Sequence, residues 1–343
     1  MSIADSIALI LVLVGGMMSG SFSLPMKRIQ IWAWENIWGV YSLIALLVTP
    51  WIVAALSVPD LLAVYGAVPA RTLFTTALFG FTWGIGSVLF GVSIPMVGMA
   101  LSFAIVVGLG AALGSLIPLV FLTPGRLYTL SGALVVAGLV LTLFAVGLLA
   151  IAGKGREKAE SKKSQKRSGD TSSSVGLGLF LCVLSGFMGP ALNFSFAFGT
   201  QILDQASGHG AARINASHAV WAISLLGGLI SNAGYAAWRL HRNSSWKLFW
   251  SPGAKINWLL ASLMGILWTG GVLLYGRGSI LLGEAGPAIG WPIFQATIVI
   301  VSSVLGALTG EWRHAERGFV RLNNTALAVL VIAIVILSIG NRV

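Results

Sequence analysis

Charged side chains are scarce in this sequence. Only 9% of its 343 residues are Asp, Glu, Lys or Arg, whereas 57% are hydrophobic; soluble domains carry roughly 25% charged residues. So few charged groups cannot cover the surface of a water-soluble protein whose chain is this apolar. The scarcity therefore excludes an ordinary soluble domain and indicates a protein that is surrounded largely by lipid.

Cysteine is rare, and the motifs of common enzymes are missing. The one cysteine, Cys182, lies inside a long apolar run, so no intramolecular disulfide can form. The sequence has no Walker loop, HExxH or GxSxG, and its GxG runs lie within apolar segments rather than at strand-to-helix turns. We therefore expect no enzymatic activity, no cofactor and no metal site.

Long apolar runs are present instead, and they recur along the whole chain. A bilayer core about 30 Å thick is crossed by roughly 20 helical residues. Runs of this length predict an all-α polytopic membrane protein with ten transmembrane helices. The expected spans are 6–26, 36–58, 72–94, 96–121, 128–152, 175–198, 214–238, 256–276, 286–309 and 322–341.

Basic residues are distributed unevenly among the loops. If the N-terminus faces outside, most of the 21 Lys and Arg fall on the inner side, including a cluster between Lys154 and Arg167. The net charge of +11 then reflects membrane topology rather than nucleic-acid binding. We expect both termini outside and a disordered cytoplasmic linker at 154–174, which divides the chain into five-helix units at 1–153 and 175–343.

Two glycine-rich stretches resemble each other across this division. GFTWGIGSVLFG (80–91) and GILWTGGVLLYG (265–276) match at three glycines, at Trp83 with Trp268, and at Phe90 with Tyr275. Because each half has an odd number of spans, equivalent helices would run in opposite directions, as in the inverted-topology repeats of secondary transporters. The alternative is chance similarity among glycine-rich membrane helices.

Small residues at spacings of three and four also predict close helix contacts in lipid. The segments GAALG (110–114) and GALTG (306–310) share this pattern and resemble each other. The glycines expected to pack helices together are Gly80, Gly86, Gly110, Gly114, Gly265, Gly271, Gly306 and Gly310.

Several stretches resemble one transporter family. PMKRIQIWAWENIW (25–38), FGFTWGIGSVLFG (79–91), VGMALSFAIVVGLGAALG (97–114) and GALTGEW (306–312) are similar to the L-rhamnose–proton symporter family of the drug/metabolite transporter superfamily. The likeness covers most of the chain, with ten apolar spans and a polar central loop. It implies proton-driven uptake of a deoxy sugar across a bacterial inner membrane.

Proton coupling requires a titratable group at membrane depth, and few are present. Glu35 opens the second span among tryptophans, and His218 lies near the outer end of the seventh. Both are candidates for carrying the proton; the alternatives are an interfacial acid and a hydrogen-bonded structural histidine. Glu311, beside Arg313, is expected to form an interfacial ion pair, while Glu284 is either a solvated loop acid or part of an entrance.

A sugar site needs polar side chains for the hydroxyls and aromatic faces for the C–H surfaces. Pro190 and Pro292 interrupt two spans near such residues, and broken spans often border transporter sites. About half of the candidates could instead join neighbouring helices. The candidate substrate-binding residues are Trp83, Trp268, Asn193, Ser195, Gln295, Trp291, Tyr275 and Asn215.

The sequence thus favours a secondary active transporter that binds a small sugar and a proton, as a monomer or a homodimer within the lipid bilayer. Two alternatives remain open. One is an exporter or facilitator of another small metabolite, which the shortage of intramembrane acids favours. The other is a membrane enzyme or receptor without transport, for which catalytic residues would gather at one interface.

Overall fold

The computed structural model describes residues 3–164 and 172–340, and in that part of the chain every regular element is a helix. Ten helical segments are long and apolar enough to cross a membrane, which confirms the expected number of spans. They run over Ile3–Arg28, Trp34–Ser57, Ala70–Val97, Leu101–Leu122, Leu130–Ala159, Val175–Gly208, Arg213–Arg242, Ala254–Leu281, Gly283–Leu308 and Arg317–Gly340.

Several spans are divided into shorter helices. The α-helices are α1 (Ile3–Ser21), α2 (Trp34–Leu43), α3 (Thr49–Ser57), α4 (Leu61–Ala67), α5 (Ala70–Val97), α6 (Met99–Leu122), α7 (Leu130–Ser164), α8 (Ser172–Met188), α9 (Ala191–Ala197), α10 (Thr200–Gly208), α11 (Arg213–Arg242), α12 (Ala254–Leu281), α13 (Gly286–Leu308) and α14 (Arg317–Gly340). Short 3₁₀ or π turns are η1 (Pro25–Arg28), η2 (Ile44–Val48), η3 (Pro124–Tyr128), η4 (Ser245–Trp250) and η5 (Gly283–Ala285).

Proline and glycine explain some of these boundaries. The sixth span breaks between α8 and α9 at Pro190, as expected, because proline lacks a backbone N–H. Pro292, in contrast, lies inside the continuous helix α13, so the ninth span is not interrupted there. The third and fourth spans are separated by Gly98, whose φ of +87° favours glycine, rather than by Pro95 within α5.

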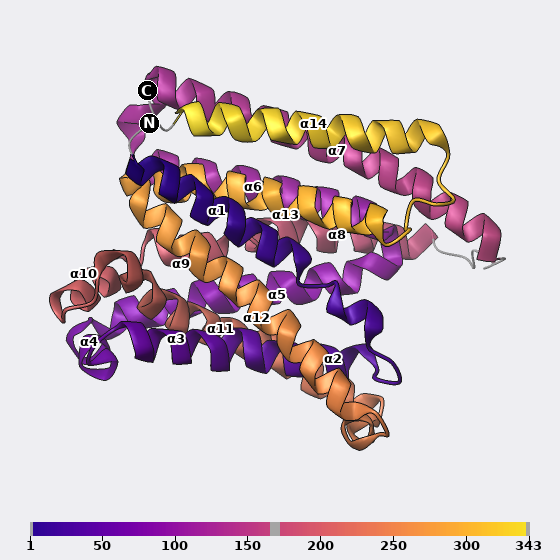
Figure 1. The fold of residues 1–343 in the computed structure, drawn as a ribbon, viewed down its shortest axis with the longest axis horizontal. Coiled ribbons are helices and arrows are strands. Elements are labelled where there is room, and N and C mark those ends of the chain that lie inside the picture. Colours follow the sequence, from indigo (N-terminus) through magenta and orange to yellow (C-terminus); the bar gives the residue numbers. More distant parts are fainter. Residues whose placement is uncertain (1–2, 165–171, 341–343) are drawn as a thin grey trace.

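The helices form one elongated bundle (Figure 1). Helices α7 and α14 lie side by side along one edge, α2, α3 and α11 lie toward the opposite edge, and α1, α5, α6, α8, α12 and α13 form the body between them. The first residues of α1 and the last of α14 lie at the end that carries α4 and α10. We call this the α10 end, and the opposite one the η4 end.

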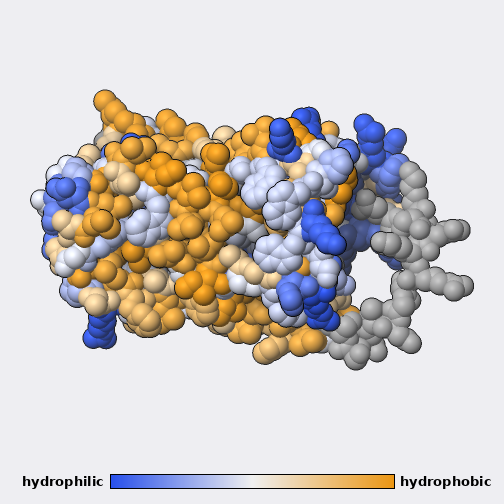
Figure 2. Space-filling model, turned by 90° about the horizontal axis from the view of Figure 1, so that it is seen from below, coloured by the Kyte–Doolittle hydropathy of each residue, from blue (hydrophilic) through white to orange (hydrophobic). Residues whose placement is uncertain are grey.

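The surface carries a broad apolar band around its middle, with polar side chains at both ends (Figure 2). Val140 and Phe144 of α7 and Ile332 and Val335 of α14 are among the exposed apolar side chains. Such a belt matches the hydrocarbon core of a bilayer, where every backbone polar group must be satisfied within the helices.

Four of the expected glycines bring facing helices close together. A Cβ atom added at Gly80 would lie 1.7 Å from the carbonyl oxygen of Ser224 in α11, and one at Gly86 would lie 2.9 Å from the Cβ of Met188 in α8. On α12, a Cβ at Gly265 would lie 2.9 Å from that of Ile44, and one at Gly271 would lie 2.4 Å from the carbonyl oxygen of Gly15 in α1.

The remaining expected glycines differ among themselves. Gly114 and Gly110 of α6 lie beside α13, where Gly114 leaves room for the ring of Trp291. Gly306 lies against the carboxylate of Glu311 in the loop that follows its own helix. Gly310 lies beyond the end of α13 with a φ of +86°, so it is a turn residue and not a helix-packing glycine.

The expected disordered linker at 154–174 is helical at both of its ends. Helix α7 continues through Ser164 and α8 begins at Ser172, while residues 165–171 lie outside the described residues. The segment KGREKAESKK consists mainly of Lys and Glu, with Ala and Arg, and these residues favour helix even when fully solvated. Low hydrophobicity was therefore an insufficient reason to expect disorder throughout this segment.

Candidate functional site

A central cavity of about 170 Å³ lies inside the bundle, between helices of both halves. Its walls include two stacked rings, Trp83 of α5 and Trp268 of α12, whose centroids are 5.2 Å apart with planes inclined by 21°. The cavity is smaller than the roughly 300 Å³ at which pockets for drug-sized ligands begin, so its size suits a small solute.

Helix α13 contributes two more of the expected residues to this cavity. Trp291 and Gln295 both line it, one turn apart on the same helix face. The indole N–H of Trp291 donates to the carbonyl of Gly110 at 3.1 Å, which fixes the ring against α6. Gln295 makes no hydrogen bond to the described residues, so its amide is available to a ligand.

Asn193 and Tyr275, in contrast, are bonded to the protein. The amide nitrogen of Asn193 donates to the carbonyls of Gly114 at 2.8 Å and Pro287 at 3.1 Å. Its amide oxygen accepts a hydrogen bond from the hydroxyl of Tyr275. Both side chains are fully buried and lie outside the residues that line the central cavity. They form a partition beside it rather than its wall.

Ser195 and Asn215 also lie outside the central cavity. The Ser195 hydroxyl donates to the carbonyl of Leu192 within α9. It also lies 2.6 Å from the hydroxyl of Ser224, and this contact joins α9 to α11. Asn215 lies in the first turn of α11, and it lines none of the three cavities described here. Of the eight expected binding residues, four therefore converge on one cavity.

Two further cavities lie on either side of the central one. A pocket of about 420 Å³ lies at the α10 end, and one of about 350 Å³ lies toward the η4 end. Helix α13 borders all three, because Pro287 lines the first, Trp291 the central one and Ser302 the last. The three cavities thus follow one face of α13 from end to end.

The two end pockets differ in how they are separated from the central cavity. Phe90 and Ile298 line both the central cavity and the η4-end pocket, so these two spaces adjoin. The α10-end pocket shares no lining residue with the central cavity. Tyr275, Asn193 and the edge of Trp291 lie between them, with the rings of Tyr275 and Trp291 5.6 Å apart.

Glu35 lies at the η4 end, in the first turn of α2, where it is only 2% exposed. One oxygen of its carboxylate accepts hydrogen bonds from the Asn243 amide and the Ser245 hydroxyl, both at 2.8 Å. The other lies 3.7 Å from the guanidinium of Arg239. The carboxylate therefore ties α2 to the end of α11, and it lines none of the three cavities.

His218 is buried in α11, with 4% of its side chain exposed. Its Nδ1 lies 2.7 Å from the hydroxyl of Ser57 in α3. It also lies outside the lining of the three cavities. One turn along α11, however, Trp221 stacks on Phe196 at 5.1 Å, and Phe196 lines the α10-end pocket.

Glu311 forms two ion pairs that sequence spacing could not reveal. Its carboxylate oxygens lie 2.6 Å from Lys27 after α1 and 2.6 Å from Arg156 in α7, rather than pairing with the neighbouring Arg313. Arg156 and Glu311 line the η4-end pocket. Glu284 lines the α10-end pocket, which agrees with the entrance interpretation of this residue.

Comparisons with known proteins give a consistent result. The family model described as L-rhamnose-proton symport protein (RhaT) matches residues 1–342. The chain is 27% identical over 347 residues to an L-rhamnose-proton symporter of Cronobacter sakazakii, covering 99% of each chain. It is 26% identical over 340 residues to one of Klebsiella pneumoniae subsp. pneumoniae, covering 96% of each.

Proposed function

The chain belongs to the L-rhamnose-proton symport protein family, and on that premise we propose that it imports a small sugar together with a proton by alternating access. The proposed substrate is L-rhamnose or a related deoxy sugar, which the names of the relatives support. The observation that carries the proposal is the central cavity, which is lined by the stacked rings of Trp83 and Trp268 and by the unbonded amide of Gln295.

The chemistry of this cavity suits a neutral sugar. Its lining combines indole rings with the amide of Gln295 and the hydroxyl of Ser87, and it includes no ionisable side chain. Aromatic rings cover the C–H faces of a sugar, while an amide both donates to and accepts from its hydroxyls. A charged solute would lack a counter-ion here, which disfavours amino acids and phosphorylated metabolites.

The helix contacts support two inverted five-helix repeats, 1–153 and 175–343. Helix α5 packs on α8 and α11, which are the first two spans of the other half, and α12 packs on α1 and α2 in the same way. The fourth spans α6 and α13 pack on each other, as do the fifth spans α7 and α14. Exchanging the halves leaves this pattern unchanged, as expected for a fold that alternates between two mirrored packings.

The partitions suggest which state is present. The central cavity adjoins the η4-end pocket through Phe90, whereas hydrogen-bonded Tyr275 and Asn193 separate it from the α10-end pocket. The loops of the η4 end carry most of the basic residues, so this end is assigned to the cytoplasm and both termini to the outside of a bacterial inner membrane. In this form the central cavity therefore adjoins the cytoplasmic pocket, with the apolar side chain of Phe90 between the two spaces.

His218 is the group that we propose to carry the coupled proton, with Glu35 as the alternative. The Glu35 carboxylate is already occupied by Arg239, Asn243 and Ser245. His218 has one hydroxyl partner, Ser57, and the charged group that acts on it is the guanidinium of Arg277. A neutral imidazole beside a hydroxyl can accept a proton when the surrounding helices move.

Uptake of labelled L-rhamnose into proteoliposomes with an imposed inward proton gradient tests the function. The wild type should concentrate the sugar, and dissipation of the gradient should abolish this accumulation. Trp83→Leu and Trp268→Leu should each weaken sugar binding about fivefold, since one aromatic contact is worth roughly 1 kcal/mol. Trp238→Leu, an exposed tryptophan on α11 away from the cavities, is the matched control.

Exchange of internal for external sugar separates coupling from binding. His218→Gln should retain exchange and lose gradient-driven accumulation, because exchange does not require release of the proton. Glu35→Gln should retain accumulation in the properly folded fraction. If Glu35→Gln loses accumulation and His218→Gln retains it, the proton-carrying role belongs to Glu35. Loss of exchange in His218→Gln would instead assign this residue to structure or binding.

Facilitated diffusion is a second candidate function, because no ionisable side chain lines the central cavity. Under this alternative, wild-type uptake is the same with and without the proton gradient and stops at equal concentrations. A panel of unlabelled sugars, amino acids and nucleosides competing for uptake then identifies the solute class.

A further inference from the structure

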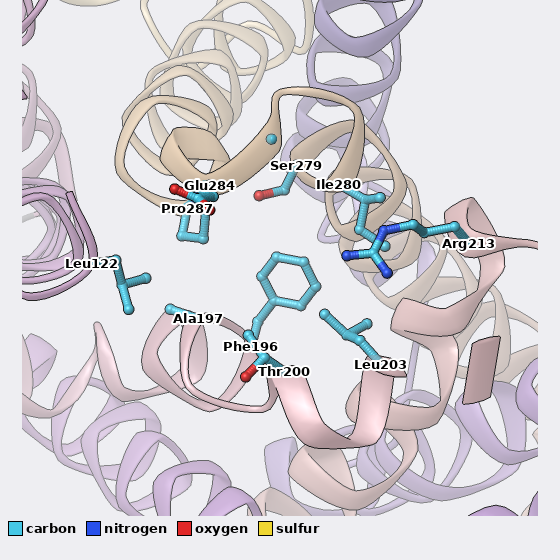
Figure 3. Close-up of a pocket in the computed structure, with 11 residues that line it drawn as sticks. Leu122, Phe196, Ala197, Thr200, Leu203, Arg213, Ser279, Ile280, Glu284 and Pro287 are labelled. Atoms are coloured by element: carbon cyan, nitrogen blue, oxygen red, sulfur yellow. The ribbon is translucent and has the colours of Figure 1, made fainter. Parts of the chain in front are cut away.

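The α10-end pocket is the largest of the three cavities, at about 420 Å³, and the function proposed above does not yet use it. It lies where α9, α10 and the start of α11 face the end of α12, η5 and the start of α13 (Figure 3). It has a lining of its own, distinct from that of the central cavity. It is therefore a separate space at the outer end of the path along α13.

Ser279 is an unusual feature of this pocket. It is only 1% exposed, yet its hydroxyl points into the space between Phe196 and Pro287 (Figure 3). The oxygen lies near the hydroxyl of Tyr275 but makes no hydrogen bond of ordinary geometry. A buried hydroxyl without a partner lowers stability unless a ligand or water satisfies it. Its orientation indicates a polar ligand in the pocket.

An aromatic ring lies opposite this hydroxyl. Phe196 projects into the middle of the pocket from α9 (Figure 3). Its position is fixed, because Trp221 stacks on it at 5.1 Å with planes inclined by 8°, and Tyr275 lies 6.1 Å away at its edge. Leu203 and Ile280 complete an apolar wall. A rigid ring beside small apolar groups fits the C–H face and methyl group of a deoxy sugar.

The rim of the pocket supplies further polar groups. Thr200, Arg213 and Glu284 line it, from α10, α11 and η5 respectively. Arg213 lies 3.5 Å from Asp204, an exposed ion pair that holds the guanidinium at the rim. These side chains provide both hydrogen-bond donors and hydrogen-bond acceptors, and their positive and negative charges balance. This combination suits a neutral ligand that carries many hydroxyls.

We propose that the α10-end pocket is a second binding site for the same small sugar, a vestibule occupied before the sugar reaches the central cavity. Ser279 binds a ring hydroxyl, Phe196 covers a C–H face, and the rim groups bind the remaining hydroxyls. The partition of Tyr275 and Asn193 then divides vestibule from central cavity. The choice of ligand rests on the proposed function, whereas the existence of the site rests on the geometry of this pocket.

Equilibrium binding of labelled L-rhamnose to the purified full-length protein tests this inference by counting bound sugars. The wild type should bind two sugars per chain. Ser279→Ala should bind one, because it removes the inward hydroxyl while keeping the volume nearly constant. Leu203→Trp, which fills the pocket from α10 without altering Ser279, should also bind one. Ser207→Ala is the matched control, since Ser207 has a buried unpaired hydroxyl on α10 outside the pocket.

The outcomes separate the two proposals. One sugar per chain in the wild type, unchanged by Ser279→Ala and by Leu203→Trp, overturns the vestibule and leaves sugar symport intact. No bound sugar in the wild type, together with no uptake in proteoliposomes, overturns the proposed substrate and the vestibule with it. Two bound sugars in both pocket variants place the second site elsewhere and also overturn the inference.

Discussion

Helices α5 and α12 carry the same glycine-rich motif, and comparing them shows where the two halves differ. In both helices the first matched glycine, Gly80 or Gly265, lies against the second span of the other half. In both, the tryptophan of the motif lines the central cavity. The shared residues therefore occupy comparable positions in the two halves, at helix contacts and at the central cavity.

The difference lies at the end of the motif. Phe90 on α5 packs edge-on against Phe103 at 6.0 Å, while its counterpart Tyr275 on α12 donates a hydrogen bond to Asn193. The next residue differs in its surroundings as well, because Gly91 has open space around it and Gly276 lies against the indole of Trp221. One partition is thus apolar and the other hydrogen-bonded. This comparison indicates that the two sides of the cavity open at different free-energy costs.

The largest expected effect comes from changing a glycine that the two motifs share. Gly80→Ala places a methyl group 1.7 Å from the Ser224 carbonyl, a backbone atom that cannot move without shifting α11. We expect a loss of about 3 kcal/mol or more in stability. The yield of monodisperse protein and the midpoint of thermal unfolding in detergent measure it.

Gly91→Ala is the matched control on the same helix, because no atom lies within 4 Å of the added carbon. It should behave as the wild type. Gly265→Ala, whose added carbon would lie 2.9 Å from the Cβ of Ile44 and 3.0 Å from the backbone nitrogen of Ala45, should be intermediate. Equal stability of Gly80→Ala and Gly91→Ala would refute the close contact between α5 and α11.

A medium effect is expected from removing the hydrogen bond that distinguishes the two partitions. Tyr275→Phe makes both of them apolar and leaves the buried oxygen of Asn193 without its donor. We expect the closed form of this partition to be destabilised by about 1–3 kcal/mol. The equilibrium then shifts toward opening at the α10 end by roughly fivefold or more. The measurement is the labelling rate of a cysteine introduced by Ser87→Cys, with an impermeant reagent applied at the α10 end of oriented vesicles.

The single native cysteine, Cys182, is buried and gives little background in this experiment. Tyr65→Phe is the matched control, because it also removes one tyrosine hydrogen bond, at 2.9 Å to the Ala219 carbonyl, but away from the cavities. An unchanged labelling rate in Tyr275→Phe would show that this hydrogen bond does not close the partition.

The smallest effect concerns the η4 end, where ion pairs supplement the apolar partition. Glu311→Gln removes the pairs to Lys27 and Arg156, and Glu311 and Lys27 are 37% and 42% exposed. Because exposed pairs contribute about 0–1 kcal/mol, we expect only a two- to threefold faster labelling of a cysteine introduced by Ser303→Cys in the η4-end pocket.

Salt provides the check on this interpretation. Raising the ionic strength screens exposed charges, so it should speed labelling in the Ser303→Cys protein and leave the rate unchanged when Glu311→Gln is also present. A salt effect of equal size in both proteins would assign it to other charges.

Sequence patterns predicted the elements better than their internal breaks. The ten spans followed from apolar length, and Trp83 with Trp268 followed from the repeated motif. The break at Pro190 was expected, but Pro292 lies within the continuous helix α13. Membrane helices tolerate internal proline where neighbouring groups satisfy the freed backbone carbonyl, so the residue type alone does not predict a break. The helical continuation of α7 to Ser164 was missed, since composition alone does not separate a solvated helix from a disordered segment.

The polar candidates could not be sorted by type alone. Asn193 and Gln295 are both amides in apolar helices, yet Asn193 is bonded to three neighbours and Gln295 faces the cavity. The partners of Glu311 are 284 and 155 residues away along the chain, so the spacing to Arg313 was misleading. Ser279 carried no sequence signal, because a serine is common in membrane helices.

The sequence by itself determined that this protein is a bundle of membrane helices, and which faces of α5 and α12 are small enough for close packing. These properties depend on the length of apolar runs and on the spacing of residues along one helix. The tertiary structure decided which polar side chains are satisfied by neighbours and which face a cavity. In lipid, helix exteriors and helix contacts are both apolar, so one helix does not specify which partner it meets.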